Sequence, residues 1–402
     1  MALEQTKLDV SIKNRTNIFN WRGQFTPEFV EYILVNFSEK NSIIADPFSG
    51  SGTVLQESAR LQLSAIGFEI NPAAYAMSKF FTFCNFSDTK RKIFCDELEQ
   101  KLFSSSLMQS NLMVYVEDPD YRTAYSSLLD FADVFGKSLD DKLERVFFLN
   151  LLFQSEKDKN LSLKDSIIKS FHYVKKCLLN LPFSEKKIIA FLSDARNTNK
   201  EFKNNIDLIL TSPPYINVFN YHQNYRGIIE KFNFDLLQVA HSEFGSNRKN
   251  RGNRFKTVIQ YCLDMELAIH SFWDSLKPNG KMILVVGRES NVRKTAFLNS
   301  QLIKELIENS GGFCKLDIQE RKFINKFGNS IKEDIIIATK NSQISNSFYA
   351  REIALKHLES NLSTKDVEIK NDILEAIKNN LDVNPSPYFN PKKIIKHEYY
   401  AA

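Results

Sequence analysis

Cysteine, tryptophan, proline and glycine are scarce in this chain of 402 residues, which contains 5, 2, 11 and 13 of them. The cysteines are scattered, with no Cys-x-x-Cys pair and no paired histidines, so we expect reduced thiols and no structural metal site. No apolar run approaches the roughly 18 residues of a membrane span, and the N-terminus lacks the apolar core of a signal peptide. These absences predict a cytoplasmic protein without membrane contact.

The remaining composition is that of an ordinary globular protein, with 43% hydrophobic and 25% charged residues. The length allows two or three domains, or one elaborated domain. A formal net charge of +5 is compatible with a polyanionic partner, although many enzymes without such a partner carry a similar charge. Composition therefore leaves the function open, and the motifs have to decide it.

A glycine-rich stretch, Asp46–Thr53, is the strongest local signal in the first half of the chain. It follows the apolar run 42–45 and precedes a helical pattern over 54–60. The order strand, acidic corner, glycine-rich turn and helix is how an open α/β sheet brings a cofactor to the carboxyl end of its first strand. No lysine follows the second glycine, so the turn is not a Walker A phosphate loop.

A second loop, with the sequence Thr-Ser-Pro-Pro-Tyr at 211–215, follows another apolar run at 206–210. A strand is also expected at 64–69, where it ends in Glu69 about 20 residues after the glycines. At that spacing an acid accepts hydrogen bonds from ribose hydroxyl groups in such sheets. Further strands are expected around 187–196, 277–287, 314–323 and 334–339.

Together, Asp46–Thr53 (DPFSGSGT) and Thr211–Tyr215 (TSPPY) resemble the cofactor and catalytic loops of the amino-methylating DNA methyltransferases. These enzymes use S-adenosylmethionine to methylate N4 of cytosine or N6 of adenine. The resemblance covers roughly residues 15–87 and 188–340. It implies an α/β fold with a seven-stranded, doubly wound, Rossmann-like methyltransferase sheet, elaborated by a helical insertion and a helical C-terminal tail.

The resemblance also implies which residues hold the cofactor. The acid at Asp194 corresponds to one that bonds the adenine amino group, and the segment before the glycine loop is expected to cover the methionine part. The residues implied are Thr26, Pro27, Asp46, Pro47, Phe48, Gly50, Gly52, Thr53, Glu69 and Asp194.

The chemistry expected of Ser212, Pro213, Pro214 and Tyr215 follows from the substrate. An exocyclic amine is a poor nucleophile because its lone pair is delocalised into the ring. The Ser212 hydroxyl and the Pro213 carbonyl can accept hydrogen bonds from it, the two prolines stiffen the loop, and Tyr215 offers a face on which a flipped base stacks. Catalysis then rests mainly on positioning and local electrostatics.

The serine before Pro-Pro-Tyr resembles the N4-cytosine subgroup, and N6-adenine remains the alternative. C5-cytosine methylation is excluded because it needs a nucleophilic cysteine, usually in a Pro-Cys dipeptide that this chain lacks. An RNA amino-methyltransferase and a non-catalytic nucleic-acid-binding subunit are weaker alternatives. Double-stranded DNA is the expected partner. No nuclease or helicase motif is evident, so a cognate restriction endonuclease would be a separate protein.

The chain is expected to divide into a cofactor-binding half (1–87), a helical insertion (88–187), a catalytic half (188–341) and a helical tail (342–402). The densest basic stretch, 245–256, offers phosphate and base contacts. Its candidate DNA-binding residues are Arg248, Lys249, Arg251, Arg254 and Lys256. The order and placement of the motifs depart from those of many relatives, and we expect the region 216–260 and the insertion to share target recognition.

Overall fold

The computed structural model describes residues 3–10, 13–109, 121–158, 162–216, 221–245, 250, 252–324 and 328–394. Its centre is a seven-stranded sheet with the spatial order β3-β2-β1-β4-β5-β9-β8. Strand β9 is antiparallel to both of its neighbours, whereas β3, β2, β1, β4 and β5 are parallel. The bounds are β1 Ile43–Asp46, β2 Ser64–Glu69, β3 Ile188–Leu192, β4 Ile206–Thr211, β5 Leu276–Gly287, β8 Phe313–Ile324 and β9 Ser330–Lys340.

The strand order reverses between β1 and β4, which lie side by side with Ile44 opposite Leu208 and Ala45 opposite Ile209. In open α/β sheets, ligands bind outside the carboxyl ends of the strands at such a switch point. The two predicted loops follow these two strands directly. The doubly wound α/β sheet predicted from the sequence is therefore confirmed, and it brings both loops to one edge.

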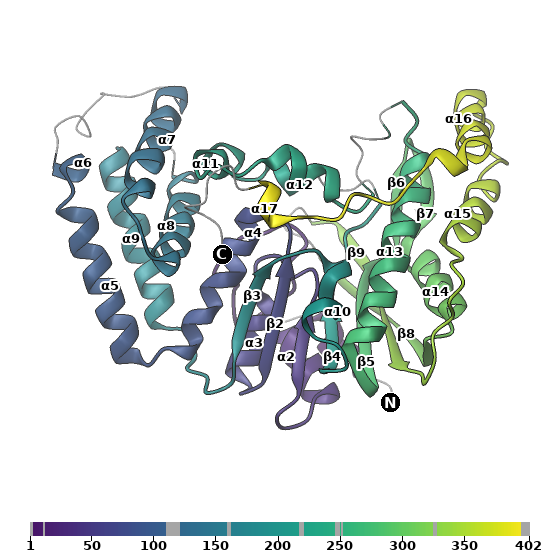
Figure 1. Ribbon diagram of the computed structural model, residues 1–402, viewed down its shortest axis with the longest axis horizontal. Helices are drawn as coiled ribbons and strands as arrows, with labels where there is room; N and C mark the ends of the chain where they lie inside the picture. The colour runs from purple at the N-terminus through teal and green to yellow at the C-terminus, as the bar shows by residue number, and fades with distance from the viewer. Residues whose placement is uncertain are drawn as a thin grey trace.

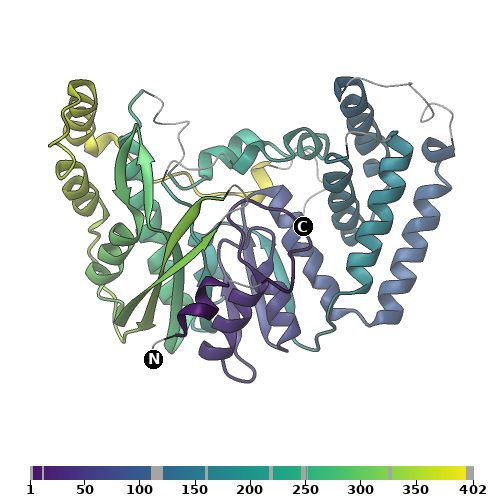
Figure 2. The same ribbon diagram turned by 180° about the vertical axis from the view of Figure 1, so that it is seen from behind.

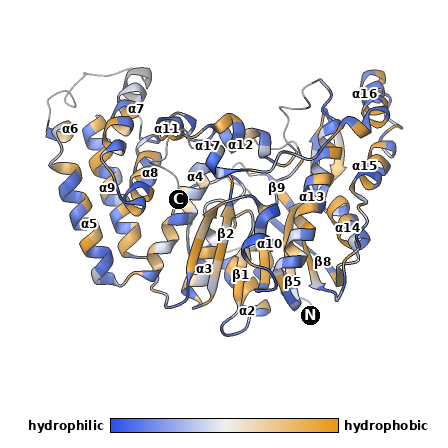
Figure 3. Cartoon of the chain, viewed as in Figure 1, coloured by the Kyte–Doolittle hydropathy of each residue, from blue (hydrophilic) through white to orange (hydrophobic). Residues whose placement is uncertain are grey.

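Helices cover both faces of the sheet (Figures 1 and 2). Side chains alternate along β4, so that Leu208 and Leu210 face one apolar core and Ile209 faces the other. The first core includes α2 (Pro27–Phe37), α3 (Thr53–Arg60) and α4 (Pro72–Phe80), and the second includes α13 (Lys256–Ser275), α14 (Asn299–Ser310) and α15 (Ala350–Glu359). Figure 3 shows the hydrophobic residues gathered on the strands between these layers.

The region between β2 and β3 forms a helical layer at the β3 end of the sheet (Figure 1). It comprises α5 (Asp88–Phe103), α6 (Ser106–Gln109), α7 (Tyr121–Lys137), α8 (Lys142–Ser155) and α9 (Leu163–Leu179). Its phenylalanines, among them Phe147 and Phe171, belong to the same apolar core as α2, α3 and α4. The fully buried Arg91 donates to the carbonyl groups of Phe83 and Leu181. The insertion thus shares one apolar core with the helices that cover this face of the sheet, and α8 packs against α4.

The C-terminal part contains α16 (Val367–Lys378) and η5 (Asn380–Asp382), and then an extended segment, 383–390, that runs back along the carboxyl edge to α17 (Pro391–Ile394) (Figure 1). The sequence predicted a helical tail but gave no sign of this crossing.

The remaining elements are α1 Gln5–Asp9, η1 Phe81–Asn85, η3 Ala195–Asn197, α10 Thr198–Glu201, η4 Tyr221–Gln223, α11 Arg226–Lys231, α12 Leu236–Ser242, β6 Glu289–Val292 and β7 Thr295–Leu298.

Within the described ranges, no helix combines the length and apolarity that crossing a membrane requires.

Candidate active site

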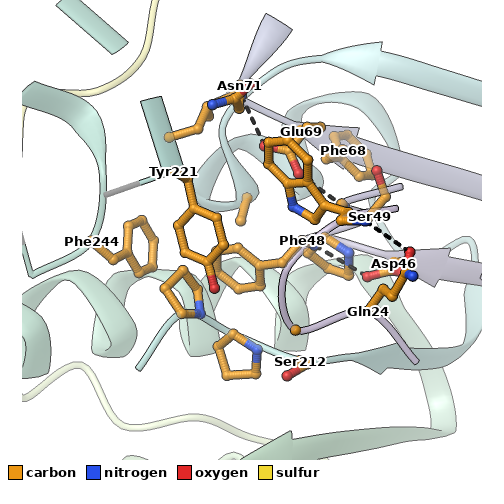
Figure 4. A pocket seen from close by; sticks show the side chains of 18 of the residues that line it. Gln24, Asp46, Phe48, Ser49, Phe68, Glu69, Asn71, Ser212, Tyr221 and Phe244 are labelled. Atoms are coloured by element: carbon orange, nitrogen blue, oxygen red, sulfur yellow. Dashed lines mark hydrogen bonds between the residues drawn. The ribbon is translucent and has the colours of Figure 1, made fainter. Parts of the chain in front are cut away.

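One pocket at the carboxyl edge is shared by the glycine-rich loop and the Ser-Pro-Pro-Tyr loop (Figure 4). Gly50 and Pro213 both line it, although they lie far apart in the sequence. Residues of both loops thus line one pocket between the ends of β1 and β4. Its lining comprises 21–25, 46–51, Thr53, 68–71, Asp194, Ala195, 212–215, Tyr221 and 243–245.

The glycine-rich loop needs its glycines for backbone shape and for space. Gly52 has φ +88°, and a Cβ atom there would lie 2.7 Å from the Phe81 ring and 2.8 Å from the Cα of Ser78. Gly50 has φ +49°, and a Cβ atom there would lie 3.2 Å from the Trp21 ring. Residues that carry a Cβ atom rarely adopt these backbone angles. The loop consequently presents bare backbone to the pocket.

Asp46 connects the two loops. Its buried carboxylate accepts a hydrogen bond from the Thr211 hydroxyl (2.5 Å) and one from the Phe48 amide (3.2 Å). The same hydroxyl accepts from the Phe48 amide at 3.1 Å. Burial raises the pKa of Asp46 to about 7, against the lowering effect of these bonds. Because Thr211 directly precedes Ser212, the acid aligns the start of the catalytic loop with the cofactor loop.

Glu69 at the end of β2 supports the glycine loop and faces the pocket. Its Oε2 accepts from the Gly50 amide (2.9 Å) and its Oε1 from the Asn71 amide (2.8 Å). Burial raises the pKa of Glu69 to about 7, and the nearby charge of Asp46 adds to the rise, while the backbone bonds oppose it. A carboxylate oxygen accepts more than one hydrogen bond, so Glu69 retains acceptor capacity for a diol.

Two buried polar groups in the pocket lining have no hydrogen-bond partner among the described residues. They are the Ser49 hydroxyl and the amide nitrogen of Asn71, whose side-chain oxygen caps α4. Buried polar groups are normally satisfied, because leaving one unpaired costs about 1–3 kcal/mol. Their position in the lining suits a polar ligand that supplies both an acceptor and a donor.

Aromatic rings close the pocket from the side of the N-terminal segment. Trp21 and Tyr221 are stacked, with ring centroids 6.1 Å apart and an interplanar angle of 20°. Tyr221 precedes His222, whose backbone amide and Nδ1 each lie 3.0 Å from a carboxylate oxygen of Glu243. Glu243 and the next residue, Phe244, also line the pocket. The aromatic wall is thus tied to the segment that leads into the basic stretch.

The four residues of the catalytic loop all line the pocket. The Tyr215 hydroxyl donates a hydrogen bond to Glu333 Oε1 at 3.2 Å. Burial and the charge of Glu333 hold the pKa of Tyr215 well above its usual value. The phenol is therefore neutral, and its hydroxyl group is held by Glu333.

A single row of residues across β5, β9 and β8 positions Tyr215. Gly287 lies opposite Glu333, and Glu333 lies opposite Arg321. A Cβ atom on Gly287 would lie 2.7 Å from the Tyr215 ring, so only glycine leaves room for the ring there. Arg321 pairs with Glu333 at 3.2 Å and stacks over the Phe29 ring at 4.0 Å. Residues of three adjacent strands thus hold the Tyr215 ring in place.

Asp194 lines the pocket, but its carboxylate is committed to the protein. Oδ1 accepts from the backbone amide and Nε of Arg196, and Oδ2 accepts from Arg196 Nη2 (2.6 Å) and from the Phe389 amide (3.0 Å). Arg196 in turn pairs with Asp264 at 3.0 Å and donates to the Ser386 carbonyl. The acid that the sequence assigned to the cofactor adenine therefore anchors the extended C-terminal segment.

Several other predicted residues lie outside the pocket lining. Thr26 and Pro27 cap and begin α2, and Gly52 caps α3. Arg254 is exposed, and Lys256 pairs with Glu375 at 3.0 Å. Three of the predicted DNA-binding residues, Arg248, Lys249 and Arg251, lie outside the described residues.

Sequence reasoning missed several residues of the lining and its support. Phe68 and Asn71 lie at the end of β2, and that position was a usable signal, whereas Trp21 lies in the segment before α2, far from any strand end. Phe244 gave no such signal, because its ring packs against residues distant in sequence, Phe48 and Arg196. Among the described residues, no group of three or more His, Cys, Asp or Glu side chains is arranged to hold a metal ion.

The sequence is similar to known DNA methyltransferases. Residues 5–80 match the family model for N6/N4 methyltransferases, described as "DNA methylase". The chain is also 22% identical over 419 residues to the type II methyltransferase M.MjaII of Methanocaldococcus jannaschii, covering 73% of this chain and 76% of that protein. Both matches support the amino-methylating DNA methyltransferase family.

Solved structures with a similar arrangement include TrmN from Thermus thermophilus, with 13% identity and a TM-score of 0.33. That match covers 80% of this chain and half of the Thermus protein's length (50%). A S-adenosylmethionine-dependent methyltransferase from Methanosarcina mazei is 12% identical with a TM-score of 0.34, over 77% of this chain and 98% of that protein.

Methyltransferases of the supported family use S-adenosylmethionine, and the pocket residues fit this cofactor. Gly50 offers bare backbone, Glu69 offers acceptors for a ribose diol, and Ser49 and Asn71 offer polar atoms that the described residues leave unpartnered. The aromatic side chains of Phe48 and Phe68 add apolar surface in the same lining. Asp194 is the member of the predicted set whose bonding within the protein leaves least capacity for a ligand.

Proposed function

We propose that this protein transfers a methyl group from S-adenosylmethionine to the exocyclic N4 of a flipped-out cytosine in double-stranded DNA. The observation that carries the proposal is the shared pocket, in which Gly50 and Glu69 stand on one side and Ser212 and Tyr215 on the other. One cleft can then hold a methyl donor and an unpaired base in contact.

In this proposal the cofactor half of the pocket binds and orients the donor. Glu69 accepts from the ribose hydroxyl groups, while Asp46 holds the two loops in register. When bound, the cofactor supplies an electrophilic methyl group on a positively charged sulfur. The lining of this half includes Pro47, Phe48 and Thr53, and its shape also depends on Thr26, Pro27 and Gly52 just outside the lining. Asp194 contributes indirectly, because it anchors the C-terminal segment.

In the other half, the Ser212 hydroxyl and the Pro213 carbonyl accept hydrogen bonds from the exocyclic amine and orient its lone pair towards the methyl group. The amine loses its proton to solvent after transfer, since no strong base is required. Base extrusion costs a few kcal/mol, and stacking on one aromatic ring returns about 1–3 kcal/mol. Tyr215, already fixed by Glu333, provides that ring without further ordering.

The serine at position 212 favours N4 of cytosine over N6 of adenine within this proposal. We further propose that the protein is the modification part of a restriction–modification system whose endonuclease is a separate protein. Basic residues of the stretch 245–256 would contact the DNA backbone, with the exposed Arg254 as the described example.

The test is mass spectrometry of nucleosides from double-stranded DNA incubated with the protein and S-adenosylmethionine. We expect N4-methylcytosine in the wild type, and at least about a hundredfold less in Ser212→Ala and Tyr215→Ala, at nearly unchanged cofactor affinity. N6-methyladenine would replace the cytosine assignment with the adenine one. Absence of both products, with methylation of RNA or of neither nucleic acid, would overturn the proposal.

A further inference from the structure

A short two-stranded ribbon, β6–β7, follows β5 and projects from the carboxyl edge of the sheet (Figure 1). It starts at Glu289, two residues after Gly287, whose missing Cβ makes room for the Tyr215 ring. Asn299 ties its base to the sheet by donating to the Gly287 carbonyl (3.1 Å) and to Ser290 Oγ (2.7 Å). The ribbon is therefore fixed to the wall of the pocket.

The tip of the ribbon has an unfavourable backbone conformation for the residues that occupy it. Val292 pairs with Thr295, so the turn consists of Arg293 and Lys294 alone. Their φ angles are +48° and +67°. Such turns are usually formed by Asn-Gly or Asp-Gly, because long side chains are strained there. Strained residues persist where the surrounding structure enforces them, and they gather at functional sites.

Helix α16 enforces this conformation through its acidic side chains. Arg293 forms ion pairs with Glu368 (2.8 Å) and with Asp372. The same helix holds the end of the basic stretch, because Asn253 donates to the Asp372 carbonyl at 2.6 Å. Lys256 pairs with Glu375 at 3.0 Å.

An aromatic contact completes this unit, with the Phe255 and Phe297 ring centroids 6.2 Å apart. The ribbon, the segment 253–256 and α16 thus form one braced unit. The Arg293 side chain is engaged in its ion pairs with α16, whereas Lys294 at the tip and Arg254 in the segment 253–256 are exposed. The brace therefore holds the chain on either side of these two exposed cations.

We propose that the β6–β7 ribbon is a DNA-docking element whose tip residue Lys294, together with Arg254, contacts backbone phosphates of the duplex beside the flipped base. The inference rests on the proposed function, because it requires a nucleic-acid duplex over the pocket. A ribbon of four residues per strand reaches about 13 Å from its base, which suits a contact with the strand that flanks an extruded base. Because the brace holds the backbone at the tip, only the Lys294 side chain has to be ordered on binding.

The chain offers a matched control for the test. Lys315 in β8 is also an exposed lysine with a positive φ, +52°. It lies beyond Cys314, which pairs with Thr339, and Thr339 pairs with Lys281 near the start of β5. This is the edge of the sheet opposite the pocket. Lys294→Gly and Lys315→Gly therefore remove the same charge and the same backbone strain at the two opposite edges.

We would measure duplex binding over a range of salt concentrations, cofactor affinity and Tm for both variants. Neither substitution should lower Tm, because glycine accepts positive φ. Lys294→Gly should weaken duplex binding several-fold, on target and unrelated sequences alike, and reduce the slope of log affinity against log salt by about 1. Lys315→Gly should leave both unchanged, and cofactor affinity should be unchanged in both variants.

Equal duplex affinity for Lys294→Gly and the wild type, in a protein that binds and methylates duplex DNA, would overturn this inference while leaving the proposed function intact. An affinity loss confined to the target sequence would also overturn it, because a phosphate contact does not discriminate sequence. A wild type that neither binds nor methylates duplex DNA would overturn the proposed function, and the inference with it.

Discussion

The cofactor loop and the catalytic loop stand at neighbouring strand ends, yet they are held in different ways. The glycine-rich loop is shaped by its own glycines and by the nearby β2 strand, through the bond from the Gly50 amide to Glu69. Tyr215 of the catalytic loop is held by residues distant in sequence, Gly287 and Glu333. Local rules therefore specify where the cofactor loop goes, whereas tertiary pairing of the later strands specifies where the tyrosine ring goes.

The largest effect should come from Gly52→Ala, which breaks the locally determined loop. Its Cβ would overlap Phe81 and the Ser78 backbone at 2.7 and 2.8 Å, at a φ of +88°. We expect a loss of at least about 3 kcal/mol in the free energy of unfolding, together with loss of cofactor binding. Denaturant titration measures the first. Gly252→Ala is the control, because a Cβ there meets nothing within 4 Å; equal stability of the two variants would contradict the account.

Gly287→Ala disturbs the catalytic loop instead, whose tyrosine is positioned by residues distant in sequence. The added methyl group would sit 2.7 Å from the Tyr215 ring and displace it. A displacement of about 1 Å in a reacting complex costs roughly a hundredfold in rate, so kcat should fall by that order while the cofactor Kd stays near the wild-type value. Single-turnover kinetics and calorimetry measure the two quantities. A parallel loss of cofactor affinity would show that the loops are not held separately.

Tyr215→Phe sharpens the comparison by removing only the hydroxyl group that donates to Glu333. The ring stays available for stacking, so we expect about a fivefold fall in kcat, from a loss of roughly 1 kcal/mol of positioning. Glu333→Gln weakens the same contact from the other side. In a double-mutant cycle the two effects should overlap, so the double variant should lose little more than either single one. Simple additivity would mean that the Tyr215–Glu333 contact does not position the ring.

The smallest effect concerns pH and the cofactor half alone. Burial raises the pKa values of Asp46 and Glu69 to about 7. A carboxyl group whose folded-state pKa lies above its unfolded value binds more protons when folded, so the stability of the free protein should decline as pH rises from about 4 to about 7.

Ribose hydroxyl groups donate to an ionised carboxylate, so cofactor affinity should change in the opposite direction. We expect it to rise severalfold between about pH 6 and about pH 8, with proton release on binding. Calorimetry in buffers of different ionisation enthalpy measures both. In Glu69→Gln the rise should be much smaller, and an unchanged pH dependence there would remove Glu69 from the ribose role.

The same contrast explains what the sequence could and could not predict. The seven strands, the acid at Glu69 and the two loops at strand ends were predicted because each is a local pattern at a strand boundary. The row formed by Gly287, Glu333 and Arg321 was not, because it arises from the register of three strands. The ribbon β6–β7 was missed as well, since its Arg-Lys turn lacks the usual Asn-Gly signal.

The C-terminal segment is the clearest case of long-range determination. Ser386 donates from its amide and its hydroxyl to Asp264, and Phe389 donates to Asp194. Burial raises the pKa of Asp264 to about 6, against the lowering effect of Arg196 and of the Ser386 bonds. No local pattern links these residues, which lie in three separate parts of the chain. An acid placed at a strand end by analogy thus proves to be shared with the tail.

A ternary complex of the protein with duplex DNA and a non-reactive analogue of S-adenosylmethionine is the most direct test. We predict an analogue between Gly50 and Glu69, and a cytosine extruded onto the Tyr215 ring with its exocyclic nitrogen within hydrogen-bond reach of Ser212. An analogue bound elsewhere, or a duplex lying away from the carboxyl edge with no base in the shared pocket, would contradict the account.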